Sequence, residues 1–126
     1  MRPTWRELVA VAIGALVGTG ARLAIDTLVG QPISTLAINV IGSLALGYLV
    51  ARLWNSAAPW LKAGLGAGLL GSFTTFSALA VTLVELGATW SAALYLVLSI
   101  GLGLTAAWAG LRLGGRRATP IDGATE

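Results

Sequence analysis

The sequence contains no cysteine and no histidine. These absences exclude disulfide bonds, thiol catalysis, imidazole bases and the usual transition-metal ligands. The chain has serines but no base available to activate them, so an intramembrane enzyme is the least favoured function and we expect none.

Charge is also scarce, because only 10% of the 126 residues are charged while 56% are hydrophobic. A mean hydropathy of +0.85 excludes both a soluble domain and a disordered chain. Four apolar stretches are each long enough to cross a bilayer, which predicts an all-α integral membrane protein. Residues 1–117 are predicted to form one four-helix domain. The predicted spans are about 7–28, 32–53, 62–86 and 89–111, and residues 118–126 are expected to form a disordered polar tail.

The basic residues flank the predicted spans, so the sequence pI near 10.2 indicates orientation in a membrane and not nucleic-acid binding. If the amino terminus is cytoplasmic, the opposite side carries only Arg22. The cytoplasmic side then carries Arg2, Arg6, Arg52, Lys62, Arg112, Arg116 and Arg117. This seven-to-one distribution is a strong positive-inside bias. The first span is expected to remain in the protein, because it lacks a convincing signal-peptide polar region and cleavage site.

The third predicted span contains an unusual polar segment, Gly-Ser-Phe-Thr-Thr-Phe-Ser at residues 71–77, within the uncharged stretch 63–84. In lipid every backbone N–H and C=O needs an internal partner, so an interruption survives only where it faces protein or a water-filled path. We therefore predict a third helix that is broken near its midpoint, which favours transport over anchoring.

Two other spans carry polar side chains at helical spacing. Thr35, Asn39 and Ser43 share one face of the second span, and Tyr95 and Ser99 lie four residues apart in the fourth. Such residues can serve simply as interhelical hydrogen bonds. Their coexistence with the broken third span favours a polar path instead, whose amide and hydroxyl groups suit a weakly hydrated anion.

Three further residues have two interpretations each. Arg22 either reaches the headgroups, alone or paired with Asp26, or supplies a vestibule charge that concentrates anions. Phe73 and Phe76 are either plain packing residues or rings whose positive edges contact an anion.

No carboxylate lies at mid-membrane, which argues against proton-coupled export.

Glycine is abundant, with 17 residues. The pairs Gly14-xxx-Gly18, Gly64-xxx-Gly68 and Ser43-xxx-Gly47 predict a tightly packed bundle. Four helices are too few to enclose much of a pore, so self-association or a partner is expected.

These residues resemble the Fluc (CrcB-type) fluoride channels over nearly the whole chain. The resemblance is carried by Gly-Thr-Gly-Ala-Arg at 18–22, Thr-Leu-Ala-Ile-Asn-Val-Ile-Gly-Ser at 35–43 and the segment 71–77. It implies an antiparallel two-fold dimer of four-helix subunits in the bacterial plasma membrane, with two narrow pores for passive fluoride export that relieves fluoride toxicity. The partner would be a second copy or a homologous subunit, surrounded by lipid.

The resemblance also implies roles for particular residues. The backbone carbonyls of Gly71 and Thr74 would hold a structural sodium ion. Asn39 would be the pore-lining amide, Phe76 a pore-facing ring and Arg22 the vestibule arginine. The polar track would contain Thr35, Ser43, Ser77, Tyr95 and Ser99.

Two features depart from the family pattern. Leu79 stands where a second pore phenylalanine is expected, and leucine has no ring quadrupole. A subunit with dual topology should have nearly balanced loops, whereas this chain is strongly biased. Both departures fit one subunit of a heterodimer. A stable antiparallel dimer of this chain alone that conducts fluoride would contradict that hypothesis.

Two alternatives stay open beside the fluoride channel. A small multidrug-type exporter also has four short helices but needs a glutamate embedded in its first span, which residues 8–21 lack. A non-conducting structural subunit of a heterodimeric channel is compatible with Leu79.

Overall fold

The computed structural model describes residues 2–115 as an all-helical chain with no β-strand in that range. Its helices, including the π-helix η1, are α1 (Trp5–Val29), α2 (Ile33–Leu53), α3 (Pro59–Lys62), η1 (Ala63–Leu70), α4 (Gly71–Phe73), α5 (Phe76–Leu86) and α6 (Trp90–Gly115). Four helical stretches of this part of the chain are long and apolar enough to span a membrane, with α3 to α5 together forming the third. The predicted fold class is therefore confirmed. The predicted tail at 118–126 lies outside the described residues, as do Arg116 and Arg117.

Local signals explain where several helices begin and end. Thr4 caps α1 by accepting a hydrogen bond from the Glu7 backbone N–H, and the Glu7 carboxylate accepts one from the Thr4 N–H at 2.8 Å. Helix α5 ends at Leu86 and is followed by its C-cap Gly87, whose φ of 65° lies in the positive range that glycine tolerates. Glu7 is thus part of the helix cap of α1.

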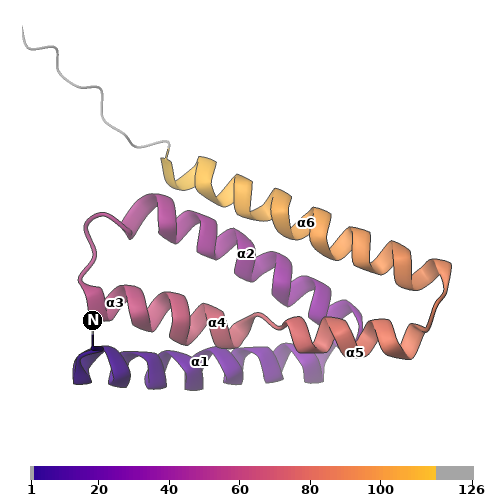
Figure 1. The fold of residues 1–126 in the computed structure, drawn as a ribbon, viewed down its shortest axis with the longest axis horizontal. Coiled ribbons are helices and arrows are strands. Elements are labelled where there is room, and N and C mark those ends of the chain that lie inside the picture. Colours follow the sequence, from indigo (N-terminus) through magenta and orange to yellow (C-terminus); the bar gives the residue numbers. More distant parts are fainter. Residues whose placement is uncertain (1, 116–126) are drawn as a thin grey trace, which may run out of the picture.

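The helices associate as two pairs, which Figure 1 shows one above the other. Helix α1 packs mainly on η1, and α2 packs mainly on α6. Between the pairs, α5 leaves the α1 side and contacts α6. The third span therefore begins in one pair and ends against the other, and its change of partner coincides with the interruption between α4 and α5.

Glycine allows both pairs to approach closely. A Cβ atom added at Gly14 would overlap the carbonyl oxygen of Gly64, and one at Gly18 would overlap that of Leu69. In the other pair, a Cβ at Gly47 would overlap the Ala107 carbonyl, and one at Gly110 the Leu44 carbonyl. The predicted tight packing is confirmed at Gly14, Gly18 and Gly47. The role of Gly110 was not anticipated from the sequence.

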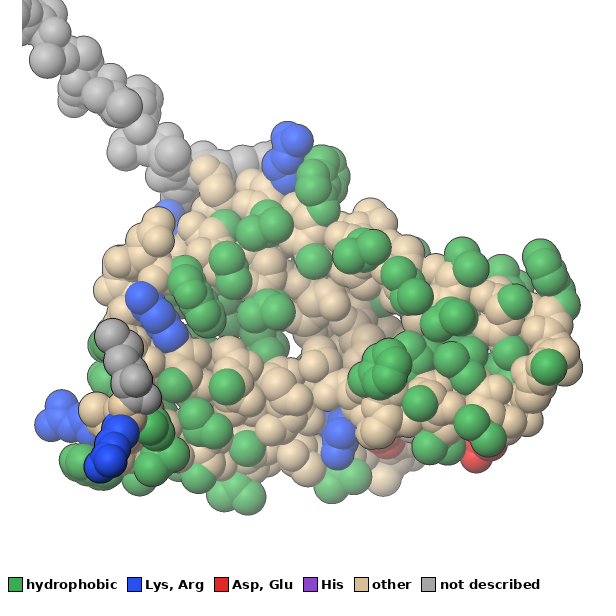
Figure 2. Space-filling model, viewed as in Figure 1, with side chains coloured by type: hydrophobic (Ala, Val, Ile, Leu, Met, Phe, Trp, Pro, Cys, Tyr) green, Lys and Arg blue, Asp and Glu red, His purple; other side chains and the backbone are tan. Residues whose placement is uncertain are grey.

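Charge is segregated between the two ends of the described bundle. The end formed by the start of α1, the end of α2, the start of the third span and the end of α6 carries Arg2, Arg6, Glu7, Arg52, Lys62 and Arg112. The other end carries Arg22, Asp26 and Glu85. Figure 2 shows the basic side chains mainly toward the first end and the acidic ones toward the second, with hydrophobic side chains along the flanks.

Candidate functional site

The third span is interrupted at two consecutive threonines. Helix α4 ends at Phe73, and Thr74 follows with φ −76° and ψ 154°. Thr75 is also extended, with φ −146° and ψ 119°, and α5 begins at Phe76. The interruption lies within an apolar span, so its backbone groups need partners other than the helical ones.

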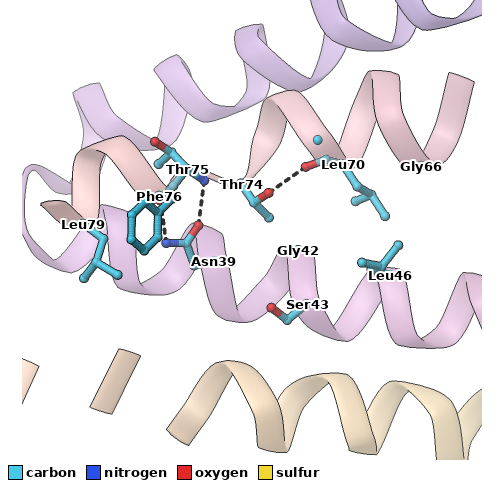
Figure 3. Close-up of a pocket in the computed structure, with 11 residues that line it drawn as sticks. Asn39, Gly42, Ser43, Leu46, Gly66, Leu70, Thr74, Thr75, Phe76 and Leu79 are labelled. Atoms are coloured by element: carbon cyan, nitrogen blue, oxygen red, sulfur yellow. Dashed lines mark hydrogen bonds between the residues drawn. The ribbon is translucent and has the colours of Figure 1, made fainter. Parts of the chain in front are cut away.

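Asn39 of α2 provides these partners for Thr75. Its Oδ1 accepts a hydrogen bond from the Thr75 N–H at 2.8 Å, and its Nδ2 donates to the Thr75 carbonyl at 2.9 Å (Figure 3). Both ends of one side-chain amide are therefore engaged with one backbone residue, in the way that a neighbouring β-strand would be. This pair of bonds ties the interruption to α2.

The Thr75 hydroxyl takes the place of a second backbone acceptor. It accepts a hydrogen bond from the Ala78 N–H at 3.1 Å, as the N-cap of α5, and also contacts the Ser77 hydroxyl at 3.1 Å. In an unbroken helix the Thr75 N–H would bond to the Gly71 carbonyl, and the Ala78 N–H to the Thr74 carbonyl. Side chains take both donors, so neither carbonyl receives its helical partner.

A cavity of about 330 Å³ lies beside the interruption, between α2 and the third span. Figure 3 shows Asn39 and Phe76 next to each other at one side of it, with Ser43 further along α2. Its lining consists of Asn39, Gly42, Ser43, Leu46, Gly66, Leu70, Gly71, Thr74, Thr75, Phe76 and Leu79. The polar groups that line it are amide, hydroxyl and backbone groups, and none of these side chains is charged.

A second cavity, of about 420 Å³, lies on the other side of Thr75 and does carry charge. It is lined by Arg22, Asp26, Gln31, Thr75, Ser77, Ala78, Val81, Thr82 and Glu85. Asp26 accepts a hydrogen bond from Gln31 Nε2 at 3.3 Å. Thr75 borders both cavities, so the interruption stands between an uncharged hollow and a charged one.

The predicted polar-track residues are divided between these surroundings. Asn39, Ser43 and Phe76 line the uncharged cavity, whereas Ser77 and Arg22 line the charged one. Thr35, Tyr95 and Ser99 line neither of these two cavities. Their hydroxyls bond within the subunit: Thr35 to the Gln31 side chain, Tyr95 to the Pro32 carbonyl at 3.0 Å, and Ser99 to the Tyr95 carbonyl at 2.7 Å.

The aromatic and leucine positions differ sharply in exposure. Phe76 is 80% exposed, whereas Phe73 is 8% exposed and packs against the α1–α2 side of the subunit. Leu79 is 6% exposed and lines the uncharged cavity beside Phe76. An aromatic ring this exposed at the middle of a span must be covered by lipid or by another subunit.

Sequence reasoning did not single out Thr75 or Thr82 as site residues. Thr75 is 8% exposed and builds the interruption, and Thr82 is 5% exposed, lines the charged cavity and donates to the Ala78 carbonyl at 3.0 Å. Thr82 lies four residues after Ala78 on one face of α5, and both line the charged cavity; as a hydroxyl residue within an apolar span it could have been identified from the sequence.

Fold and site together define a multi-pass helical membrane protein with hollows on both sides of a broken third span. Residues 9–111 match the family model described as "CrcB-like protein, Camphor Resistance (CrcB)". The chain belongs to this family, and the resemblance predicted from its motifs is confirmed.

Curated bacterial relatives support the same assignment. The chain is similar to "Fluoride-specific ion channel FluC 2" of Halalkalibacterium halodurans, with 39% identity over 125 residues, covering 94% of this chain and 93% of the relative. The "Fluoride-specific ion channel FluC" of Paracoccus denitrificans is 40% identical over 112 residues, covering 82% and 90% respectively. That of Vibrio cholerae is 38% identical over 112 residues, covering 79% and 88%.

Proposed function

We propose that this chain is a subunit of a fluoride-selective ion channel that lets cytoplasmic fluoride leave the cell passively and so relieves fluoride toxicity. The observation that carries the proposal is full-span similarity, because relatives named as fluoride-specific channels match most of the chain at 38–40% identity. The uncharged cavity at the interruption adds a physical reason. No lysine or arginine side chain lines this cavity to trap an anion, and neutral donors can replace its water.

Asn39 and Phe76 are the residues that we assign to the fluoride pore beside the interruption. An asparagine amide has two N–H groups, and the Thr75 carbonyl uses one, which leaves one for a passing ion. The adjacent Phe76 ring offers a weakly positive edge. Ser43 and Ser77 extend the proposed track on either side, and Thr35, Tyr95 and Ser99 belong to it by resemblance.

The proposed pores form in an antiparallel dimer, with a second copy or a homologous subunit as the partner. Two observations support a partner at the interruption. Phe76 is 80% exposed although it lies at a polar site. Gly71 is exposed, and a Cβ there would meet only the Gly66 carbonyl, at 3.5 Å. Packing within the subunit therefore does not require glycine at 71, whereas close approach from outside would.

A structural sodium ion fits the same place. The described residues contain no group of three His, Cys, Asp or Glu side chains that could hold a metal, so a cation at the interruption would depend on backbone oxygens. The carbonyls of Gly71 and Thr74 both lack their helical donors, and hard cations prefer oxygen ligands. The positive charge of the ion would attract these carbonyl oxygens at the interruption and so hold the ends of the broken third span together.

Leu79 favours one second candidate, a non-conducting structural subunit of a heterodimeric channel. Leu79 lines the cavity with an aliphatic side chain, at 6% exposure. A multidrug-type exporter gains no support, because the glutamate of α1 is Glu7, which belongs to the helix cap.

Fluoride efflux from potassium-loaded liposomes, started with valinomycin and followed with a fluoride electrode, separates channel from scaffold. One preparation contains the chain alone, and the other contains it co-expressed with a family homologue of opposite charge bias. We expect protein-dependent efflux in at least one preparation. Efflux in the first identifies the partner as a second copy. Efflux in neither preparation contradicts the proposed function.

The orientation of the chain provides a separate prediction. Because the sequence has no cysteine, Asn55→Cys and Ala88→Cys each give one labelling site, in loops at opposite ends of the bundle. The charge segregation predicts that an impermeant maleimide labels Ala88→Cys on spheroplasts, whereas Asn55→Cys reacts only after permeabilisation. That result requires a homologous antiparallel partner in the cell. Equal labelling of both variants before permeabilisation would show dual topology and contradict the prediction.

A further inference from the structure

We propose that Asn39 and Thr75 are positioning residues that create the cation site, by withdrawing two backbone N–H donors from the carbonyls of Gly71 and Thr74. The inference rests on the proposed sodium site and extends it. It assigns a role to Thr75, and it gives Asn39 a role beyond contact with an anion.

The first withdrawal is made across helices. The Thr75 N–H points to Asn39 Oδ1 at 2.8 Å, and the reciprocal bond from Nδ2 to the Thr75 carbonyl at 2.9 Å fixes the same residue in an extended conformation (Figure 3). Without Asn39, the Thr75 N–H would lose its side-chain acceptor within an apolar span. Its nearest alternative acceptor along the chain is the Gly71 carbonyl, which it would bond in a regular helix.

The second donor is taken from the Thr74 carbonyl by a side chain of the same segment. The Thr75 hydroxyl accepts from the Ala78 N–H at 3.1 Å, and this N–H would otherwise continue the helix by bonding to the Thr74 carbonyl. Thr75 is 8% exposed, so solvent does not compete for its hydroxyl. Two side chains therefore keep two carbonyls without helical donors in a segment that could otherwise close into a continuous helix.

The threonine before this one behaves differently. The Thr74 N–H and hydroxyl both bond to the Leu70 carbonyl, each at 3.0 Å. The N–H bond is the regular helical one, so Thr74 takes no donor from either cation ligand. A Cβ atom at Gly42 would overlap the Thr74 methyl group, which shows that α2 packs closely against the interruption. Asn39 and Thr75 therefore take N–H donors from the two cation ligands, whereas the neighbouring Thr74 does not.

The test measures thermal unfolding of the purified dimer in detergent, in sodium chloride and in potassium chloride of equal concentration, without fluoride. We expect sodium to raise the midpoint of the wild-type protein more than potassium does. Asn39→Ala and Thr75→Val should lose this difference, or need at least about tenfold more sodium to produce it. General destabilisation would lower both midpoints without removing the difference between the two ions.

Matched variants control for position and shape. Asn55→Ala makes the same chemical change as Asn39→Ala in the exposed loop between α2 and α3, away from the Asn39–Thr75 bonds, and Thr75→Ser keeps the capping hydroxyl. Both should retain the sodium-dependent rise. Thr75→Val preserves side-chain volume and leaves Asn39 in place, so it carries the test where Asn39→Ala does not fold.

Two results would overturn the inference: a wild-type protein that responds equally to sodium and potassium, or a full sodium-dependent rise in Asn39→Ala or Thr75→Val. Because the measurement uses no fluoride, its outcome is separate from that of the efflux experiment. A protein that binds sodium in this way but conducts no fluoride would retain the inference and lose the proposed function.

Discussion

Replacing Asn39 by alanine is expected to reduce fluoride efflux at least about 100-fold, because it removes two part-buried hydrogen bonds to the Thr75 backbone and the neutral donor proposed for the ion. The Thr75 N–H and C=O would be left to find partners in an apolar span. We expect the interruption to reorganise and the uncharged cavity beside it to change shape. The measurement is the initial rate of fluoride efflux from liposomes at equal amounts of protein.

The chain supplies a matched control for this variant. Asn55 is the only other asparagine and lies in the exposed loop between α2 and α3, so Asn55→Ala makes the same chemical change away from the interruption. It should leave efflux within about twofold of the wild-type rate, as exposed surface substitutions generally have small effects. Comparable rates for Asn39→Ala and the wild-type protein would show that the Asn39–Thr75 bonds are dispensable for conduction.

Substituting Gly18 by alanine should cause a large loss of stability from a single added methyl group. Its Cβ would overlap the Leu69 carbonyl oxygen, and backbone atoms on both sides prevent an easy adjustment. Overpacking of this kind costs about 1–3 kcal/mol of unfolding free energy. Separation of α1 from η1 would also disturb the start of the third span, which the cavity at Asn39 depends on. Unfolding in mixed micelles of increasing denaturing detergent measures the change.

Gly20 is the control for this prediction because it lies in the same helix, two residues away, with nothing within 4 Å of an added Cβ. Alanine there should be neutral or stabilise by up to about 1 kcal/mol, because alanine has the higher helix propensity. Equal destabilisation by Gly18→Ala and Gly20→Ala would contradict the packing of α1 on η1 that the structure describes.

Much of the fold follows from the sequence because the bilayer imposes a length and a polarity on each span. The apolar stretches predicted the four helices, and the glycine spacing of α1 predicted a close neighbour. Spacing within one helix identifies a face but not the helix that it meets. The contact of Gly47 with the Ala107 carbonyl, and of Gly110 with that of Leu44, therefore became visible only in the structure.

The site shows the same limit. The sequence identified Asn39 and the segment 71–77 as unusual, since each places polar groups in an apolar span. It could not show that Asn39 bonds to a backbone residue 36 positions away. The role of Thr75 could not be predicted from the sequence for a related reason. Its hydroxyl acts as a helix cap only because α5 begins at Phe76, and that start depends on the tertiary bonds to Asn39.

The position of Leu79 bears on how complete the pore of one subunit is. Leu79 lines the cavity next to Asn39, while the adjacent Phe76 is exposed toward whatever covers the subunit. In the proposed antiparallel assembly, an aromatic side chain of the partner would supply the second ring there. The same proposed assembly also accounts for the charge segregation between the two ends of the bundle.

The most direct test of the central claim is the ratio of fluoride to chloride efflux from the same liposomes, measured with ion-selective electrodes under a potassium gradient clamped by valinomycin. The liposomes contain either the chain alone or the chain co-expressed with a family homologue, whichever preparation releases fluoride. A fluoride-selective channel should release fluoride rapidly while chloride stays inside until detergent is added. Chloride release at a rate comparable to that of fluoride, or no release of fluoride from any assembly of the chain, would contradict it.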